Sequence, residues 1–81
     1  MLTARVFVNL KGGVLDPQGR AVARALVSDG FSEVSDARVG KLIELKLEGD
    51  DPAAARERVK AMCEQLLANT VIESYEIEIR G

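Results

Sequence analysis

Two Asp-Pro pairs, 35 residues apart, constrain the fold of this chain more than any other feature of its sequence. Asp16-Pro17 and Asp51-Pro52 each follow a segment in which apolar and polar residues alternate. Aspartate can cap the free backbone N–H groups at a helix start, and proline suits the first helical position because no N–H is needed there. Each pair therefore predicts a change from strand to helix, and together they predict two βαβ halves that form a weak internal repeat.

Four segments have the pattern of β-strands. Apolar and polar residues alternate over residues 2–11 and 41–48, which is typical of strands with one face in a core. Residues 31–39 are short of apolar side chains and resemble an edge strand, joined to the next strand as a hairpin by a turn at Gly40. Alternation returns over residues 71–80, which we expect to form the other edge of the sheet.

Two segments have the apolar spacing of helices. The first begins at Pro17 and is expected to end in a left-handed cap at Gly30, and the second begins at Pro52 and is expected to stop at Asn69. The order βαββαβ predicts an α+β, ferredoxin-like two-layer sandwich: a four-stranded antiparallel sheet with both helices on one face. At 81 residues, we expect a single domain over residues 1–81.

Composition limits the classes of partner and compartment. The formal net charge is −2, there is no Trp, and no cluster of Lys and Arg is interleaved with aromatic residues. Such a chain lacks the features that bind nucleic acid. No leader pattern or long apolar run is present, and Cys63 is the only cysteine, so we expect a cytoplasmic protein without a membrane segment.

The residues that would carry catalysis are scarce. The chain has no histidine, and Cys63 falls on the apolar stripe of the second helix, where a small buried hydrophobe is expected. The glutamates of the strands, such as Glu44 and Glu76, alternate with core residues and are expected on a solvated face. We therefore expect no catalytic, cofactor-binding or metal-binding residues in this chain.

Contact with other proteins is the expected use of its surface. Phe7 and Leu42 point away from the predicted core, and the last strand has a free edge, so we expect self-association. Arg20 and Arg24 are explained by surface solubility more readily than by an acidic partner, and the Gly12-Gly13 loop is explained as a turn more readily than as an anion site. The candidate subunit-contact residues are Phe7, Lys11, Gly12, Gly13, Val14, Gln18, Arg20, Arg24, Leu42 and Tyr75.

Three segments together resemble the PurS family, the small subunit of phosphoribosylformylglycinamidine (FGAM) synthase. Leu10-Lys11 followed by Gly13-Val14-Leu15-Asp16-Pro17-Gln18-Gly19 carries the strongest resemblance. The segment 38–45 looks like the central hairpin of the family, and residues 62–69 with 71–77 look like its last helix and strand. The family usually has proline after Asn69, where this chain has Thr70.

The resemblance implies a role in the ATP-dependent amidation of formylglycinamide ribonucleotide, with glutamine as nitrogen donor, in purine biosynthesis. In that family a glutaminase subunit releases ammonia, and a large synthetase subunit uses ATP and magnesium. The small subunit, a dimer or higher oligomer, bridges the two and assists ammonia transfer. The resemblance therefore implies an accessory subunit of a ligase, with no cofactor of its own.

The residues alone leave two other functions open. One is a ferredoxin-like regulatory module that binds a small ligand at a dimer interface through the Gly12-Gly13 loop. The other is a small hydrolase of the acylphosphatase kind, which would need an anion-cradling loop with an arginine. The loop here presents Asp16 instead, which disfavours the hydrolase.

Overall fold

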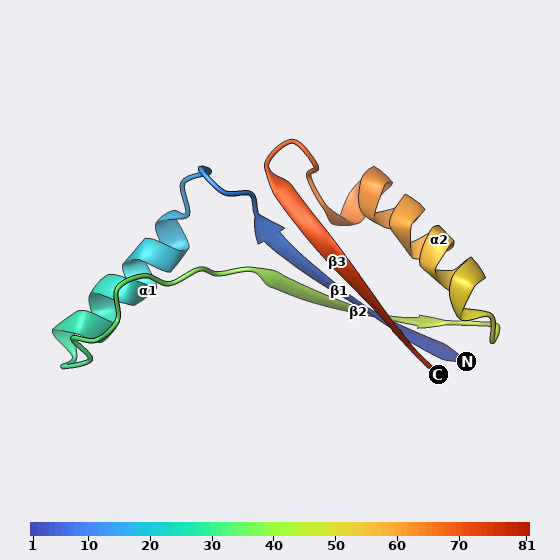
Figure 1. Ribbon diagram of the computed structural model, residues 1–81, viewed down its shortest axis with the longest axis horizontal. Helices are drawn as coiled ribbons and strands as arrows, with labels where there is room; N and C mark the ends of the chain where they lie inside the picture. Colours follow the sequence, from blue (N-terminus) through green and yellow to red (C-terminus); the bar gives the residue numbers. More distant parts are fainter.

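The computed structural model describes residues 1–81, which form three strands and two α-helices (Figure 1). Along the chain these are β1 (Leu2–Leu10), α1 (Pro17–Ser28), β2 (Lys41–Leu47), α2 (Pro52–Met62) and β3 (Glu73–Arg80). A single π-helical turn, Cys63–Leu67, continues α2. None of the helices has the length and apolar character needed to cross a membrane.

The three strands form one antiparallel sheet in the order β2-β1-β3, with β1 in the centre. In the register, Val6 of β1 lies opposite Ile43 of β2 and Ile77 of β3. The alternation in the sequence correctly predicts these strands to within two residues at each end, and it correctly places β3 at an edge.

The core lies between one face of the sheet and α2. Every second residue of β1 is buried there, and Val59 and Cys63 of the helix are fully buried against them. Burial accordingly raises the pKa of the Cys63 thiol. The expectation that Cys63 is a small buried hydrophobe is therefore consistent with its position. The buried cluster consists of Ala4, Val6, Val8, Val59, Cys63 and Ala68.

The prediction of a fourth strand over residues 31–39 is wrong for the single chain. These residues are extended after a turn but pair with no strand, so the outer edge of β2 is free and no hairpin forms. One physical reason is local: the Asp16 carboxylate accepts a hydrogen bond from the Val39 N–H, which ties the end of this segment to the start of α1 instead of to the sheet.

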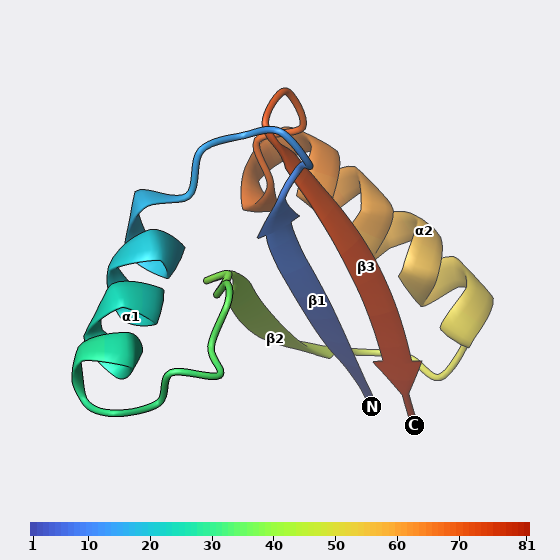
Figure 2. The ribbon, with the colours of Figure 1, turned by 60° about the vertical axis from the view of Figure 1, so that its left-hand side comes forward.

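The prediction that both helices cover one face of the sheet is also wrong for the single chain. α2 packs on β1 and β3, whereas α1 makes no substantial contact with the sheet or with α2. Figures 1 and 2 show α1 projecting beyond the end of the sheet, with residues 31–39 returning beside it. The chain is consequently long and thin, with extents of 48 × 26 × 14 Å.

The helix boundaries follow the predicted capping signals closely. Asp16 and Asp51 are the N-caps, each followed by proline, and Gly30 takes the expected positive φ of 102° after α1. The second helix ends differently, because the π-helical turn leads into extended backbone at Ala68, one residue before the expected stop at Asn69.

Candidate subunit-contact surfaces

Asp16 joins the two chain segments that connect α1 to the sheet. One carboxylate oxygen accepts from the Gly19 N–H at 2.9 Å, and the other accepts from the Val39 N–H at 3.0 Å. Arg38 adds a second link between the same segments, because its Nη2 donates to the Leu10 carbonyl at 2.9 Å. The Asp-Pro motif is therefore both a helix start and a tie that sets where α1 leaves the sheet.

The electrostatics of Asp16 agree with this role. The backbone hydrogen bonds from Gly19 and Val39 hold the pKa of its carboxyl below the usual value of 3.8, and the nearby Arg38 charge acts in the same direction. Because the folded pKa is lowered, the stabilisation by Asp16 is present above the unfolded pKa. It is lost as the pH falls through the folded pKa.

Two glycines permit the close approach of these segments. A Cβ on Gly19 would lie 2.3 Å from the Ala37 carbonyl oxygen, and a Cβ on Gly40 would lie 2.7 Å from the Val8 carbonyl oxygen. Only glycine fits at such distances without displacement of the backbone. The last glycine of the Gly13–Gly19 motif is thus required by packing between the start of α1 and residue 37.

Several predicted contact residues gather around an open hollow of about 420 Å³ beside the first loop. Gly12, Gly13, Val14 and Arg20 line it, and Gly13 has a positive φ of 85° that favours glycine. As an anion site the hollow is poor, because the Asp16 carboxylate already accepts from the amide at the helix start. The geometry explains these glycines as turn residues.

Lys11 and Gln18 flank this loop along the chain. The Lys11 Nζ donates to the Thr70 carbonyl at 2.7 Å, and its backbone N–H donates to the Ile72 carbonyl at 2.8 Å. Lys11 therefore fixes the loop before β3, so part of its side chain is used within the chain. Gln18 is exposed in the first turn of α1 and lines a second hollow with Val39 and Gly40.

Phe7 and Leu42 lie directly opposite each other on the face of the sheet that α2 does not cover. Leu42 is 49% exposed, and the Arg5 guanidinium lies 5.7 Å from the centre of the Phe7 ring. Arg5 also forms an ion pair with Glu44, with Nε and Oε2 at 3.4 Å. This face, which we call the open face, combines an apolar pair with flanking charges.

Tyr75 and Arg24 are not near the other candidates. Tyr75 lies on the helix-covered side of β3, packs against the core, and donates its hydroxyl to Glu64 Oε2 at 2.5 Å. Arg24 is exposed on α1, about two turns after the helix start at Pro17. The structure thus distributes the ten predicted residues over the first loop, the open face and the segment from α1 through residue 39, here called the arm, with Tyr75 half-buried beside α2.

An exposed apolar tip was not predicted from the sequence. Leu66 and Val71 are 83% and 81% exposed, and Ile72 is 40% exposed, at the end of α2 and in the loop before β3. Asn69 holds this loop through its side chain and its carbonyl, which accept from Val71 and Ile72. The spacing of Val59, Met62 and Leu66 is that of a helical core stripe, but the π-helical turn places Leu66 on the surface.

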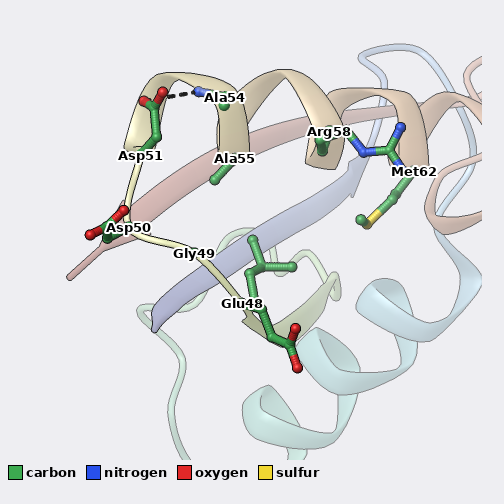
Figure 3. A pocket seen from close by; sticks show the side chains of 9 residues that line it. Glu48, Gly49, Asp50, Asp51, Ala54, Ala55, Arg58 and Met62 are labelled. Carbon is green, nitrogen blue, oxygen red and sulfur yellow. Dashed lines mark hydrogen bonds between the residues drawn. The ribbon is translucent and has the colours of Figure 1, made fainter.

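A groove between α2 and β2 forms an apolar hollow on the surface, with a volume of about 360 Å³ (Figure 3). Met62 and Ala55 form its helix side, and Leu47 of β2 lies on the opposite side. Glu48 and Asp50 lie at the end of the groove where the chain passes from β2 to α2. Sequence reasoning missed the groove because a second helix was expected to fill this position.

Comparisons with known proteins identify what this arrangement resembles. The PurS family model, described as phosphoribosylformylglycinamidine (FGAM) synthase, matches residues 3–81. The phosphoribosylformylglycinamidine synthase subunit PurS of Bacillus subtilis (strain 168) is 52% identical over 79 residues, which span 98% of this chain and 93% of that protein.

Two solved structures share the fold over nearly the whole chain. The crystal structure of Methanocaldococcus jannaschii PurS, one of the subunits of formylglycinamide ribonucleotide amidotransferase in the purine biosynthetic pathway, has a TM-score of 0.92 and 41% identity. It covers 99% of this chain and 96% of its own. A chain of PurLQS from Thermotoga maritima has a TM-score of 0.86 and 34% identity, with 99% of both chains covered.

Proposed function

The chain belongs to the PurS family of FGAM synthase, and from this premise we propose that it is the small, non-catalytic subunit of this synthase in purine biosynthesis. In this role it contacts a large synthetase subunit and a glutaminase subunit and assists the transfer of ammonia between them. ATP and Mg²⁺ act on the synthetase subunit. The observation that carries the proposal is the family match over residues 3–81, together with the likeness to a chain of PurLQS.

The composition and surface of the chain support an assembly role. It has no histidine, and no three side chains among Cys, Asp and Glu come together as a potential metal site. In contrast, nine large apolar side chains are exposed, and seven of them lie on the arm, the open face and the tip: Val22, Val27, Phe31, Leu42, Leu66, Val71 and Ile72. Apolar surface of this extent marks sites of protein contact.

We also propose that the chain associates with itself, as a dimer or tetramer. Only 8 of its 81 residues are buried, which is little for a chain that must pay the conformational entropy of folding alone. Both edges of the sheet, β2 and β3, are free, and free edges favour pairing or coverage by other chains. Self-association would cover part of this surface and leave the rest for the enzyme subunits.

Reconstitution tests the assembly role. Synthetase and glutaminase subunits are assayed with and without this chain, using either glutamine or ammonium as nitrogen donor. We expect glutamine-dependent synthesis to need the chain, whereas ammonium-dependent synthesis by the synthetase needs it less, because free ammonia requires no transfer between subunits. Unchanged glutamine-dependent activity and complex size without the chain would refute the proposal.

A surface variant locates the contact. Leu42→Glu places a charge on the open face without touching the core, because Leu42 is half exposed. We expect it to weaken assembly with the enzyme subunits by at least about tenfold, as the loss of a buried apolar contact implies. Ala53→Glu is the matched control, since Ala53 is exposed in the first turn of α2, away from the open face. Equal effects of the two variants would exclude the open face as the contact.

A further inference from the structure

The outer edge of β3 is a row of backbone groups that no other strand of the chain covers. β3 pairs with β1 along one side only, and no strand lies beyond it in the sheet (Figure 2). Its eight residues, Glu73–Arg80, extend over about 26 Å. A free edge of this length favours pairing with a strand from another chain.

The backbone groups of alternate residues in β3 point away from β1. The Ile72 carbonyl accepts from the Lys11 N–H at 2.8 Å, which directs residue 72 and every second residue after it toward β1. The backbone N–H and C=O groups of the residues between them are therefore directed outward. Within the strand, the outward residues with a free N–H are Tyr75, Ile77 and Ile79.

Arg56 of α2 covers one acceptor on this edge. Its Nη1 donates to the Ile77 carbonyl at 3.0 Å, and the Arg56 side chain is otherwise exposed. A side chain held by one exposed hydrogen bond can move aside without the loss of a buried contact. An incoming strand can therefore replace Arg56 with a backbone N–H of its own.

The side chains of β3 on the open face carry negative charge. Glu78 and Glu76 point to this face, where they lie opposite Arg5 and Phe7 of β1. Glu78 also forms an ion pair with Arg80, whereas Glu76 is exposed and forms no ion pair. A strand added beside β3 would place its own side chains directly opposite these glutamates. Opposite charges stabilise such a pair of positions, and like charges destabilise it.

A second copy of β3 is a poor partner for this edge. Two copies that pair in an antiparallel manner about a two-fold axis must keep the same face of the sheet on the same side. With Ile77 at the axis, Glu76 of each copy lies opposite Glu78 of the other. With Glu76 at the axis, the two Glu76 side chains meet each other. The two registers with the longest overlap therefore both bring like charges together.

We propose that the outer edge of β3 receives an extended segment of a different protein, with lysine or arginine at the positions opposite Glu76 and Glu78. The outward backbone groups supply the affinity, and the two glutamates select a basic segment. The proposal rests on the function proposed above, so the segment belongs to the synthetase or the glutaminase subunit. Self-association then uses other surfaces of the chain.

A competing possibility is that Arg56 and the two glutamates only keep other strands away. Charged side chains on an edge strand are a common protection against unwanted pairing. In that case neither subunit would protect the outward N–H groups, and a reversed charge at Glu76 would leave the binding of both subunits unchanged. The two explanations therefore predict different results in the same experiments.

Hydrogen exchange tests the edge residue by residue. The N–H groups of Tyr75, Ile77 and Ile79 should exchange rapidly in the chain alone, because no strand pairs with them. They should exchange at least about tenfold more slowly after the synthetase or the glutaminase subunit is added. The N–H groups of Glu76 and Glu78 are the internal control, because they point to β1 and are protected in both states.

A reversed charge tests the choice of partner. Glu76→Lys should raise the dissociation constant of the bound subunit at least about tenfold, measured by calorimetry, because like charges would then face each other. The substitution leaves the fold intact, since Glu76 is exposed and has no ion pair to lose. Glu57→Lys is the matched control, because Glu57 is exposed on α2 and also forms no ion pair. It should leave the dissociation constant unchanged.

The opposite results separate this proposal from the enzyme role. If a subunit binds but leaves the outward N–H groups unprotected, or binds the Glu76→Lys chain as tightly as the parent, the edge is not its docking site. The enzyme role stands in that case as long as glutamine-dependent synthesis needs the chain. Protection of these N–H groups that rises with the concentration of the chain alone would place a second copy on the edge and refute the proposal. If neither subunit binds the chain, the enzyme role and the docking site are both wrong.

Discussion

At the scale of single residues, one hydrogen bond determines both the position and the pKa of the Tyr75 side chain. Its hydroxyl donates to Glu64 Oε2 at 2.5 Å, which links β3 to the π-helical turn after α2. This hydrogen bond, followed by burial, raises the pKa of Tyr75 to about 12 from a usual value of 10.0. A residue predicted to contact another subunit thus also holds the last helical turn on the sheet within the chain.

Tyr75 is the only tyrosine, so the ultraviolet absorbance of tyrosinate reports on this residue alone. We expect an ionisation near pH 12 in the folded chain. Because the folded pKa is raised, the stabilisation is present below the unfolded pKa and is lost as the pH rises through the folded value. Glu64→Gln should move the ionisation back toward 10.0, and an unchanged titration in this variant would contradict the assignment.

At the scale of elements, the base of the arm depends on a backbone approach that only glycine allows. The start of α1 lies against residue 37, so that a Cβ on Gly19 would meet the Ala37 carbonyl oxygen and the Asp16 carboxylate at 2.3 and 2.6 Å. The same carboxylate binds the N–H groups of Gly19 and Val39. The start of α1 and residues 37–39 are therefore held together as one structural unit, and Gly19 lies at their contact.

Gly19→Ala should destabilise this unit by about 1–3 kcal/mol, the usual cost of overpacking at a site without free space. Hydrogen exchange of the α1 amides and chemical denaturation measure the loss. Gly12→Ala is the matched control, because no atom lies within 4 Å of the Cβ position and φ at that residue is not positive. A similar loss in both variants would show that the contact with residue 37 is not the cause.

At the scale of the whole molecule, the single chain is an incomplete fold. A small core between the sheet and α2 coexists with a helix, α1, that makes no substantial contact with either, and the radius of gyration of 16.1 Å reflects this separation. Stability must then depend on whatever covers the groove and the arm. If that partner is a second copy, the folded state is favoured by mass action.

The melting temperature should therefore rise with protein concentration. For a dimer of chains this short, we expect about 3–6 °C for each tenfold increase, since half of about 1.4 kcal/mol falls to each chain. Calorimetry over a hundredfold concentration range measures the slope. Val22→Glu, which places a carboxylate among the exposed apolar side chains of α1, should reduce the dependence of the melting temperature on concentration. A parent chain whose melting temperature does not change with concentration would argue against a dimeric folded state.

Local signals in the sequence were enough for the elements and for the family. Alternation placed the three strands, Asp16 and Asp51 placed both helix starts, and Gly30 placed the end of α1, because each depends on contacts within a few residues. The motif from Gly13 to Gly19, with two further segments, indicated the PurS family that the match over residues 3–81 shows.

The placement of those elements was decided only by tertiary structure. Residues 31–39 have a strand-like pattern, yet pairing requires the edge of β2, and the tie between Asp16 and Val39 holds them beside α1. Leu66 has core periodicity, yet the π-helical turn exposes it. Periodicity indicates which apolar side chains are to be buried but not which element or chain packs against them. Burial depends on contacts that are distant in sequence or that come from another molecule.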